Sequence, residues 1–293
     1  MTTADAARCS DVTVEALPGT AKQGSVILAY EQRQGWGHDI LDGDALGEDT
    51  APIKAMLKAS GASLLFIRKP GRGGQYRKGH RLYLCFAELG VAEELDVDTP
   101  AAMLSLDLSG PGRNGARPVD YPLALVCTHG KRDRCCAIKG RPLAASLQGC
   151  FAGDEVWEAS HMKGHRFAPT LMLLPWGYSY GRLNFQAASA MMHAAEEGQL
   201  FLPGLRGRGI YDAPAQVAEI AVAERVTALI GSIAVERADA ASSALPAFRV
   251  VAGERAFRVV CEPTKYEGVV ASCGKPAKCG KGWRAVEVTE LAG

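Results

Sequence analysis

The sequence lacks any long apolar run. Residues 1–24 are polar and rich in alanine, without the apolar core of a signal peptide, and no later stretch is long and apolar enough to span a bilayer. We therefore expect a cytoplasmic protein with no membrane partner. An excess of one charge is also missing, because 33 lysines and arginines stand against 32 aspartates and glutamates, spread along the chain. This balance gives no reason to expect nucleic acid as a partner. The sequence also shows no internal repeat.

Cysteine, by contrast, is abundant. The nine cysteines are Cys9, Cys85, Cys127, Cys135, Cys136, Cys150, Cys261, Cys273 and Cys279. Their odd number and uneven spacing argue against a disulfide framework, and a reducing compartment would disfavour one. Some of these cysteines are better explained as metal ligands.

Two cysteines and two histidines form one short constellation. Cys127 and Cys136 are followed closely by His161 and His165. Two thiolates and two imidazoles suit a tetrahedral zinc ion, and they equally suit a [2Fe-2S] cluster in which histidines replace cysteines on one iron. The residue types alone leave both metals open.

The segment Ser109–Gly115 is rich in glycine and proline and divides the chain near residue 116. On either side, strand and helix signals alternate, which predicts an α/β fold. Residues 1–115 are predicted to form an N-terminal α/β region with strands at Ser25–Tyr30, Ser63–Arg68, Leu82–Phe86 and, more weakly, Met103–Leu108, and a helix at Pro52–Ala59. Residues 116–235, which contain the four candidate ligands, are predicted to form a second α/β domain with strands at Pro122–Cys127, Glu155–Ala159 and Thr170–Leu174, and helices at Cys136–Leu147, Asn184–Glu197 and Ala213–Ile230. Residues 236–293 are predicted to form a β extension with a hairpin, Phe248–Val251 and Phe257–Val260, and a last strand near Trp283–Val288.

A proline before one predicted strand indicates a particular α/β fold. The run Phe167–Leu174 resembles the loop of the thioredoxin fold in which a cis-proline precedes a central strand, here Pro169. In that fold this loop faces the end of the first strand and the start of the next helix. A thioredoxin-like domain would therefore gather the two cysteines and the two histidines in one surface pocket.

Several segments resemble one known family. They are Cys127–Cys136, Val156–His161, His165–Thr170 and Tyr178–Arg182, with looser matches at Glu31, Gly35–Gly37 and Ser272–Lys275. Together they resemble the sucrase/ferredoxin-like family, also called thioredoxin-like ferredoxins. Characterised members carry a [2Fe-2S] cluster bound in the order Cys, eight residues, Cys, then His-x-x-x-His. The resemblance implies Cys127, Cys136, His161 and His165 as the cluster ligands.

The adjacent cysteines leave an ambiguity of one residue. Counting from Arg132-Asp133 places the second ligand of the family at Cys136, with Cys135 as the less favoured alternative. A thiolate at a helix start gains from the exposed amides and the helix dipole, but both cysteines would share that gain. His129 lies in the same loop and is expected to hydrogen-bond the backbone, to support a ligand, or to replace one. A second metal centre from Cys261, Cys273 and Cys279 is only weakly indicated.

Electron transfer is the function that this set of ligands favours. Two neutral imidazoles make the cluster less negative, so its potential is expected to exceed that of an all-cysteine ferredoxin. A histidine whose second nitrogen reaches water can also exchange a proton, which would make the potential fall as the pH rises. We expect an electron carrier with an unknown redox partner protein and no catalytic residue in the strict sense.

Parts of the sequence are also compatible with other functions. A structural zinc site uses the same ligand types. A thiol-disulfide oxidoreductase is suggested by the fold, but no Cys-x-x-Cys follows the first strand of the second region. Sucrose hydrolysis would need a pair of carboxylates flanking the scissile bond, and Glu158 and Asp133 are not singled out as such a pair. The N-terminal half is also a candidate docking module for another redox protein.

Overall fold

The computed structural model describes residues 8–43, 45–71, 78–151, 153–238 and 245–292. It is a mixed α/β structure with two compact units. The first unit comprises Met1–Gln23, Lys163–Ala168 and Tyr178–Gly293, and the second comprises Gly24–Met162 and Pro169–Gly177. The domain boundary predicted near residue 116 lies inside the second unit, just before a short strand that begins at Arg117.

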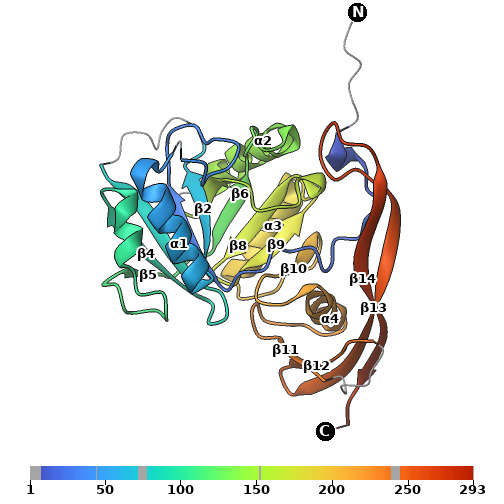
Figure 1. The fold of residues 1–293 in the computed structure, drawn as a ribbon. Coiled ribbons are helices and arrows are strands. Elements are labelled where there is room, and N and C mark those ends of the chain that lie inside the picture. The colour runs from blue at the N-terminus through green and yellow to red at the C-terminus, as the bar shows by residue number, and fades with distance from the viewer. Residues whose placement is uncertain (1–7, 44, 72–77, 152, 239–244, 293) are drawn as a thin grey trace, which may run out of the picture. The chain divides into compact units, whose positions relative to one another are not determined.

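The strands of the second unit lie in one sheet, in the order β8-β6-β7-β2-β1-β3-β4-β5 (Figure 1). The strands are β1 (Val26–Glu31), β2 (Ser63–Arg68), β3 (His80–Phe86), β4 (Val91–Val97), β5 (Arg117–Val119), β6 (Leu123–Cys127), β7 (Val156–Ala159) and β8 (Thr170–Leu174). The helices are α1 (Thr50–Ser60), α2 (Arg134–Cys150) and the 3-10 helices η2 (Gly47–Asp49) and η3 (Pro100–Ser105).

The same topology occurs twice in this unit, although the sequence shows no repeat. In the N-terminal half, α1 connects the parallel strands β1 and β2, and β3 pairs antiparallel with the other side of β1. In the second half, α2 connects the parallel strands β6 and β7, and β8 pairs antiparallel with the other side of β6. The halves meet where β2 and β7 pair antiparallel, with Ile67 opposite Ala159. Ile67 also pairs with Glu31 and Ala159 with Cys127, so Glu31 and Cys127 occupy equivalent positions.

Apolar runs explain the central strands, and capping residues explain the helix ends. Every residue of β6 and of β8 is buried, as expected for strands covered on both faces. Helix α1 ends at Gly61, whose φ of 70° is the left-handed conformation that glycine tolerates best. Helix α2 begins after Asp133, whose side chain accepts a hydrogen bond from the peptide nitrogen of Cys135.

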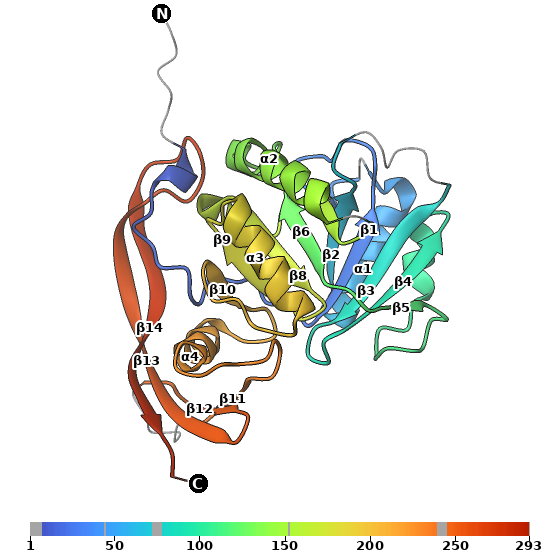
Figure 2. The ribbon, with the colours of Figure 1, turned by 180° about the vertical axis from the view of Figure 1, so that it is seen from behind.

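In the first unit, helix α4 packs on a four-stranded antiparallel sheet with the order β11-β12-β13-β14 (Figure 2). The helices and strands of the first unit are η1 (Cys9–Asp11), η4 (His165–Phe167), β9 (Tyr178–Gly181), α3 (Phe185–Glu196), β10 (Leu205–Arg208), α4 (Ala213–Ala223), β11 (Ala234–Arg237), β12 (Ala247–Ala252), β13 (Arg255–Val269) and β14 (Lys278–Glu290). Val217 and Val222 of α4 share a core with Phe248 and Phe257 of the sheet. One carboxyl group on α4, that of Glu219, is fully buried and accepts a hydrogen bond from the hydroxyl of Tyr178 at 2.8 Å.

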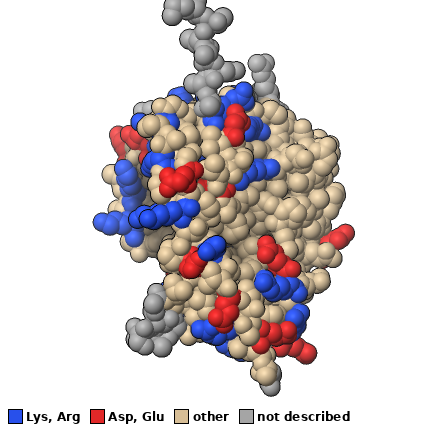
Figure 3. Space-filling view, turned by 90° about the vertical axis from the view of Figure 1, so that its right-hand side faces the viewer, with Lys and Arg blue, Asp and Glu red and all other residues tan. Residues whose placement is uncertain are grey.

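Charged pairs cover the long β13–β14 hairpin. Ion pairs join its two strands at Arg255–Glu290, Arg258–Glu287 and Arg284–Glu262, at 2.5–2.7 Å. Figure 3 shows basic and acidic side chains interspersed on the face in view. Exposed pairs of this kind add little stability, but charges along an edge strand such as β14 oppose unwanted pairing with other chains.

The elements predicted at Ser63–Arg68 and Thr170–Leu174 coincide with β2 and β8, and most other predicted elements are present with shifted ends. Two predictions were wrong. The strand expected at Met103–Leu108 is largely the 3-10 helix η3, and the helix expected to reach Ile230 ends at Ala223, where the buried run gives way to the exposed Glu224 and Arg225.

The expected cis-proline was also misplaced. Among the described residues, the cis peptide bond is the one between Leu174 and Pro175, at the end of β8, and the bond before Pro169 is trans. Ala168 before it is simply extended, with a ψ of 145°, which is the ordinary conformation before a proline.

Candidate metal centre

Three of the four expected ligands converge in the second unit. Cys127 is the last residue of β6, Cys136 lies in the first turn of α2, and His161 lies two residues after the end of β7. The ligand atoms of these three residues all lie within 4.8 Å of one another. Because β6 and β7 are parallel and α2 connects them, both strand ends and the helix start lie at one edge of the sheet, where α/β proteins commonly bind ligands.

The fourth expected ligand, His165, belongs to the first unit, where it opens η4. Only four peptide units separate it from His161, so the two Cα atoms cannot be more than about 14 Å apart. Its role as a ligand stays a prediction.

Contacts within the first unit hold the segment that carries His165. The guanidinium group of Arg206 is almost fully buried, and it donates hydrogen bonds to the carbonyl oxygens of Lys163 and Thr20. The Arg166 side chain pairs with Glu15, with one N···O distance of 2.9 Å. Residues on both sides of His165 in the sequence are therefore held by contacts within the first unit.

Helix geometry separates the two adjacent cysteines. Successive residues of an α-helix point about 100° apart, so only one of them can face the end of β6. The group of converging ligands contains Cys136, the residue that the family resemblance favours over Cys135. The peptide nitrogen of Cys135 donates to the capping carboxylate of Asp133 at 2.9 Å.

A hydrogen bond joins the two thiols of the group. The thiol of Cys136 donates to Cys127 and lowers the pKa of Cys127 well below its ordinary value, helped by His161 and opposed by burial. The same hydrogen bond, together with burial, raises the pKa of Cys136. These directions favour the thiolate of Cys127, the form in which cysteine binds a metal, and a bound metal would displace the proton of Cys136.

His129 connects the ligand loop to the N-terminal half. Its Nε2 lies 2.6 Å from the carbonyl oxygen of Gly37, and its Nδ1 accepts a hydrogen bond from the peptide nitrogen of His161 at 3.2 Å. Burial lowers the pKa of His129, which favours the neutral ring with a proton on Nε2. Because both ring nitrogens are engaged, these contacts favour a positioning role over ligation. The contact with Gly37 links residues far apart in sequence, and no local pattern signalled it.

A glycine in α2 allows the helix to pack directly on the first ligand. A Cβ atom on Gly140 would lie 2.1 Å from the carbonyl oxygen of Cys127 and 3.5 Å from Cγ2 of Thr128. Any side chain at this position would push α2 away from the end of β6. In the sequence, this contact is signalled only by a glycine inside a helical pattern.

The three C-terminal cysteines do not gather. The thiol of Cys261 faces the carbonyl oxygen of Pro214 at 3.4 Å, and the exposed Cys279 contacts the carbonyl oxygen of Gly280 at 3.6 Å. Cys273 lies instead beside Cys9, with 3.7 Å between their sulfur atoms. Within the described part of the first unit, these three thiols therefore form no common metal site.

The sequence profile of the sucrase/ferredoxin-like family matches residues 17–207. The chain belongs to the sucrase/ferredoxin-like family. The matched region contains Cys127, Cys136, His161 and His165, together with Gly140. Comparisons with curated proteins and with solved structures find no match. In the described part of this family member, no helix has the length and apolar character needed to cross a membrane.

Proposed function

We propose that this protein is a one-electron carrier that binds a [2Fe-2S] cluster through Cys127, Cys136, His161 and His165. The observation that carries the proposal is the convergence of two buried thiols and an imidazole within 4.8 Å. Soft thiolates with imidazole are the donor set that iron–sulfur clusters of the mixed Cys/His type require.

The residues of the chain have separate tasks in this proposal. A bound cluster would supply one-electron oxidation and reduction. Cys127 and Cys136 bind as thiolates, and their burial keeps water from the sulfurs. The two histidines bind as neutral rings, which raises the potential above that of an all-cysteine cluster. We also propose that a histidine ligand loses a proton more readily when the iron is oxidised, so that the potential falls as the pH rises.

We assign the second half of the second unit to a thioredoxin-like fold on the basis of its topology. In it, a helix connects two parallel strands, β6 and β7, and β8 runs antiparallel on the far side of β6. The N-terminal half has the same order, but Glu31 stands where the second half has Cys127. The proposed cluster therefore belongs to the second half, and the N-terminal half supports it through the contact between Gly37 and His129.

The geometry supports two of the competing functions less well. A thiol-disulfide oxidoreductase must expose its attacking sulfur, whereas Cys127 and Cys136 are both fully buried. The carboxylates considered for glycoside hydrolysis have structural partners. Glu158 accepts hydrogen bonds from Arg68 and Thr128, and Asp133 caps α2. Structural zinc remains the alternative that the donor set allows.

The deciding experiment is an absorption spectrum of anaerobically purified protein, with iron, sulfide and zinc counted per chain. We expect a red-brown protein with two irons and two sulfides per chain. A colourless protein with one zinc ion and no iron would refute the proposal in favour of a structural metal.

Matched cysteine variants test the ligands. Cys136→Ser should lose most of the iron, whereas Cys135→Ser should keep it, because only Cys136 joins the converging group. His161→Ala and His165→Ala should each lose the iron or shift its spectrum. Retention of a native spectrum in Cys136→Ser would contradict the assignment of the second ligand.

A further inference from the structure

A second pair of cysteines lies in the first unit. Cys9 opens η1 near the N-terminus, and Cys273 lies in the loop between β13 and β14. Their sulfur atoms are 3.7 Å apart although 264 positions separate them in the sequence. The fold of this unit therefore brings together two thiols from opposite ends of the chain.

We propose that Cys9 and Cys273 form a reversible disulfide bond, so that the protein has a two-electron redox site in addition to the proposed cluster. A disulfide needs an S–S distance of about 2.05 Å, so the two sulfurs must approach by less than 2 Å, roughly what side-chain rotation and a small loop movement supply. The bond requires only these two sulfurs, and the proposal does not depend on the cluster.

The two thiols differ in access, which sets the order of the reaction. Cys273 is partly exposed, whereas Cys9 is buried. With a small-molecule disulfide as the oxidant, the Cys273 thiolate attacks one of its sulfurs and releases one small thiol. The Cys9 thiolate then attacks the sulfur of Cys273 and releases the second small thiol. Two electrons and two protons pass from the protein thiols to the small disulfide, which becomes two small thiols.

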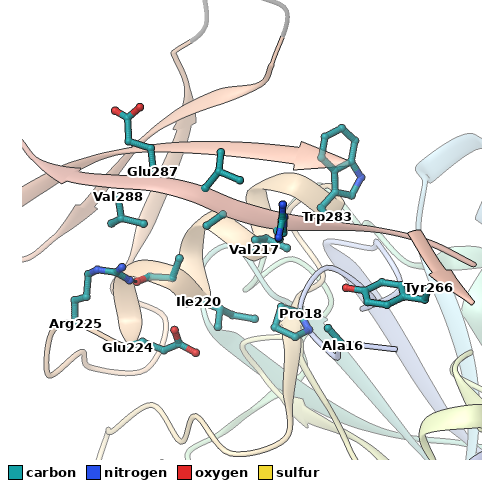
Figure 4. Close-up of a pocket in the computed structure, with 14 residues that line it drawn as sticks. Ala16, Pro18, Val217, Ile220, Glu224, Arg225, Tyr266, Trp283, Glu287 and Val288 are labelled. Carbon is teal, nitrogen blue, oxygen red and sulfur yellow. Dashed lines mark hydrogen bonds between the residues drawn. The ribbon is translucent and has the colours of Figure 1, made fainter. Parts of the chain in front are cut away.

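The bond would connect two segments that also form the walls of one cavity. A cavity of about 320 Å³ in the first unit is lined by the N-terminal segment at Ala16 and Pro18, by α4, and by the hairpin at Tyr266 and Trp283 (Figure 4). Cys9 precedes the first of these segments, and Cys273 lies at the turn of the hairpin. The disulfide would therefore add a covalent link between the N-terminal segment and the hairpin, and reduction would remove that link.

The test is a redox titration of the full-length protein in mixtures of oxidised and reduced glutathione, followed by alkylation, digestion and mass spectrometry. The Cys9–Cys273 linked peptide should increase with the proportion of oxidised glutathione and disappear after treatment with dithiothreitol. It should persist in Cys279→Ser, which removes the exposed thiol nearest in sequence to Cys273. It should be absent from both Cys9→Ser and Cys273→Ser.

Protection from unfolding provides a second measurement. The oxidised protein should melt several degrees above its reduced form, and Cys273→Ser should show no such difference, because only a disulfide constrains the unfolded chain. Two results would overturn the proposal. One is the absence of the linked peptide at every glutathione ratio. The other is a tightly bound zinc ion that is lost in Cys273→Ser, since a zinc ion bound by these thiols would show that they are metal ligands.

Discussion

The packing of Gly140 against Cys127 leads to the sharpest prediction. Gly140→Ala places a methyl group 2.1 Å from the carbonyl oxygen of Cys127. The contact must open by about 1 Å or more to reach ordinary van der Waals separation. Overpacking of this kind costs about 1–3 kcal/mol, against a gain of up to about 1 kcal/mol from replacing glycine by alanine in a helix.

The same helix offers a matched control. Gly149 also lies in α2, and a Cβ atom there would meet nothing within 4 Å. Gly149→Ala should therefore be neutral or slightly stabilising. We expect Gly140→Ala to be about 2 kcal/mol less stable than Gly149→Ala, because the helix preference is common to both variants and the packing cost falls on Gly140→Ala alone.

Urea unfolding of the metal-free proteins, monitored by circular dichroism, measures this difference without the contribution of metal binding. Iron content after anaerobic purification measures the effect on the site. A shift of α2 moves Cys136 relative to Cys127, so Gly140→Ala should also hold less iron than Gly149→Ala. Equal stability and equal iron content in the two variants would refute the close packing of α2 on the first ligand.

Three further predictions follow from single contacts. His129→Ala should weaken metal affinity about 10-fold or more, because it removes the hydrogen bond that the ring accepts from the peptide nitrogen of His161. His193→Ala, at a histidine whose side chain is 63% exposed, should leave the affinity unchanged, and competition with a chelator measures both variants. Burial raises the pKa of Glu219 from 4.5 to about 7, so the folded state holds the proton more tightly than the unfolded chain. The contribution of Glu219 to the free energy of unfolding should therefore be full below pH 4.5 and fall by up to about 3 kcal/mol as the pH rises to 7. Urea midpoints measured across this pH range should show the decline, and Glu219→Gln should abolish it. Asp133→Ala should cost about 1 kcal/mol in urea unfolding through loss of the α2 cap, and Asp133→Asn, which can still accept the hydrogen bond, should cost less.

Local sequence patterns predicted much of the secondary structure. Runs of apolar residues at Ser63–Arg68 and Thr170–Leu174 have the length and bounds of strands, and the structure has strands with the same bounds. Strand β4 was missed because Glu93, Glu94 and Asp96 interrupt its apolar pattern. Strand β4 pairs along its length with β3, and Glu94 and Asp96 form ion pairs with Arg81 and Arg117 of the neighbouring strands. A prediction from adjacent residues includes none of these contacts.

The sequence by itself determined which residues are available for a metal and in what order. Two cysteines and two histidines at short spacing offer the ligands of a zinc ion or a [2Fe-2S] cluster, and the resemblance to the family pattern favours Cys136 over Cys135 as the second ligand. Those properties depend on residue type and on separations of a few residues, which a sequence displays directly.

Only the tertiary structure decided what surrounds these residues. It placed Gly37 against His129, Gly140 against Cys127 and Cys9 against Cys273, and it showed one topology twice without a sequence repeat. Each of these contacts depends on strand register and helix packing between distant segments. Such contacts depend on how the whole chain buries its apolar surface, which no short stretch of sequence records.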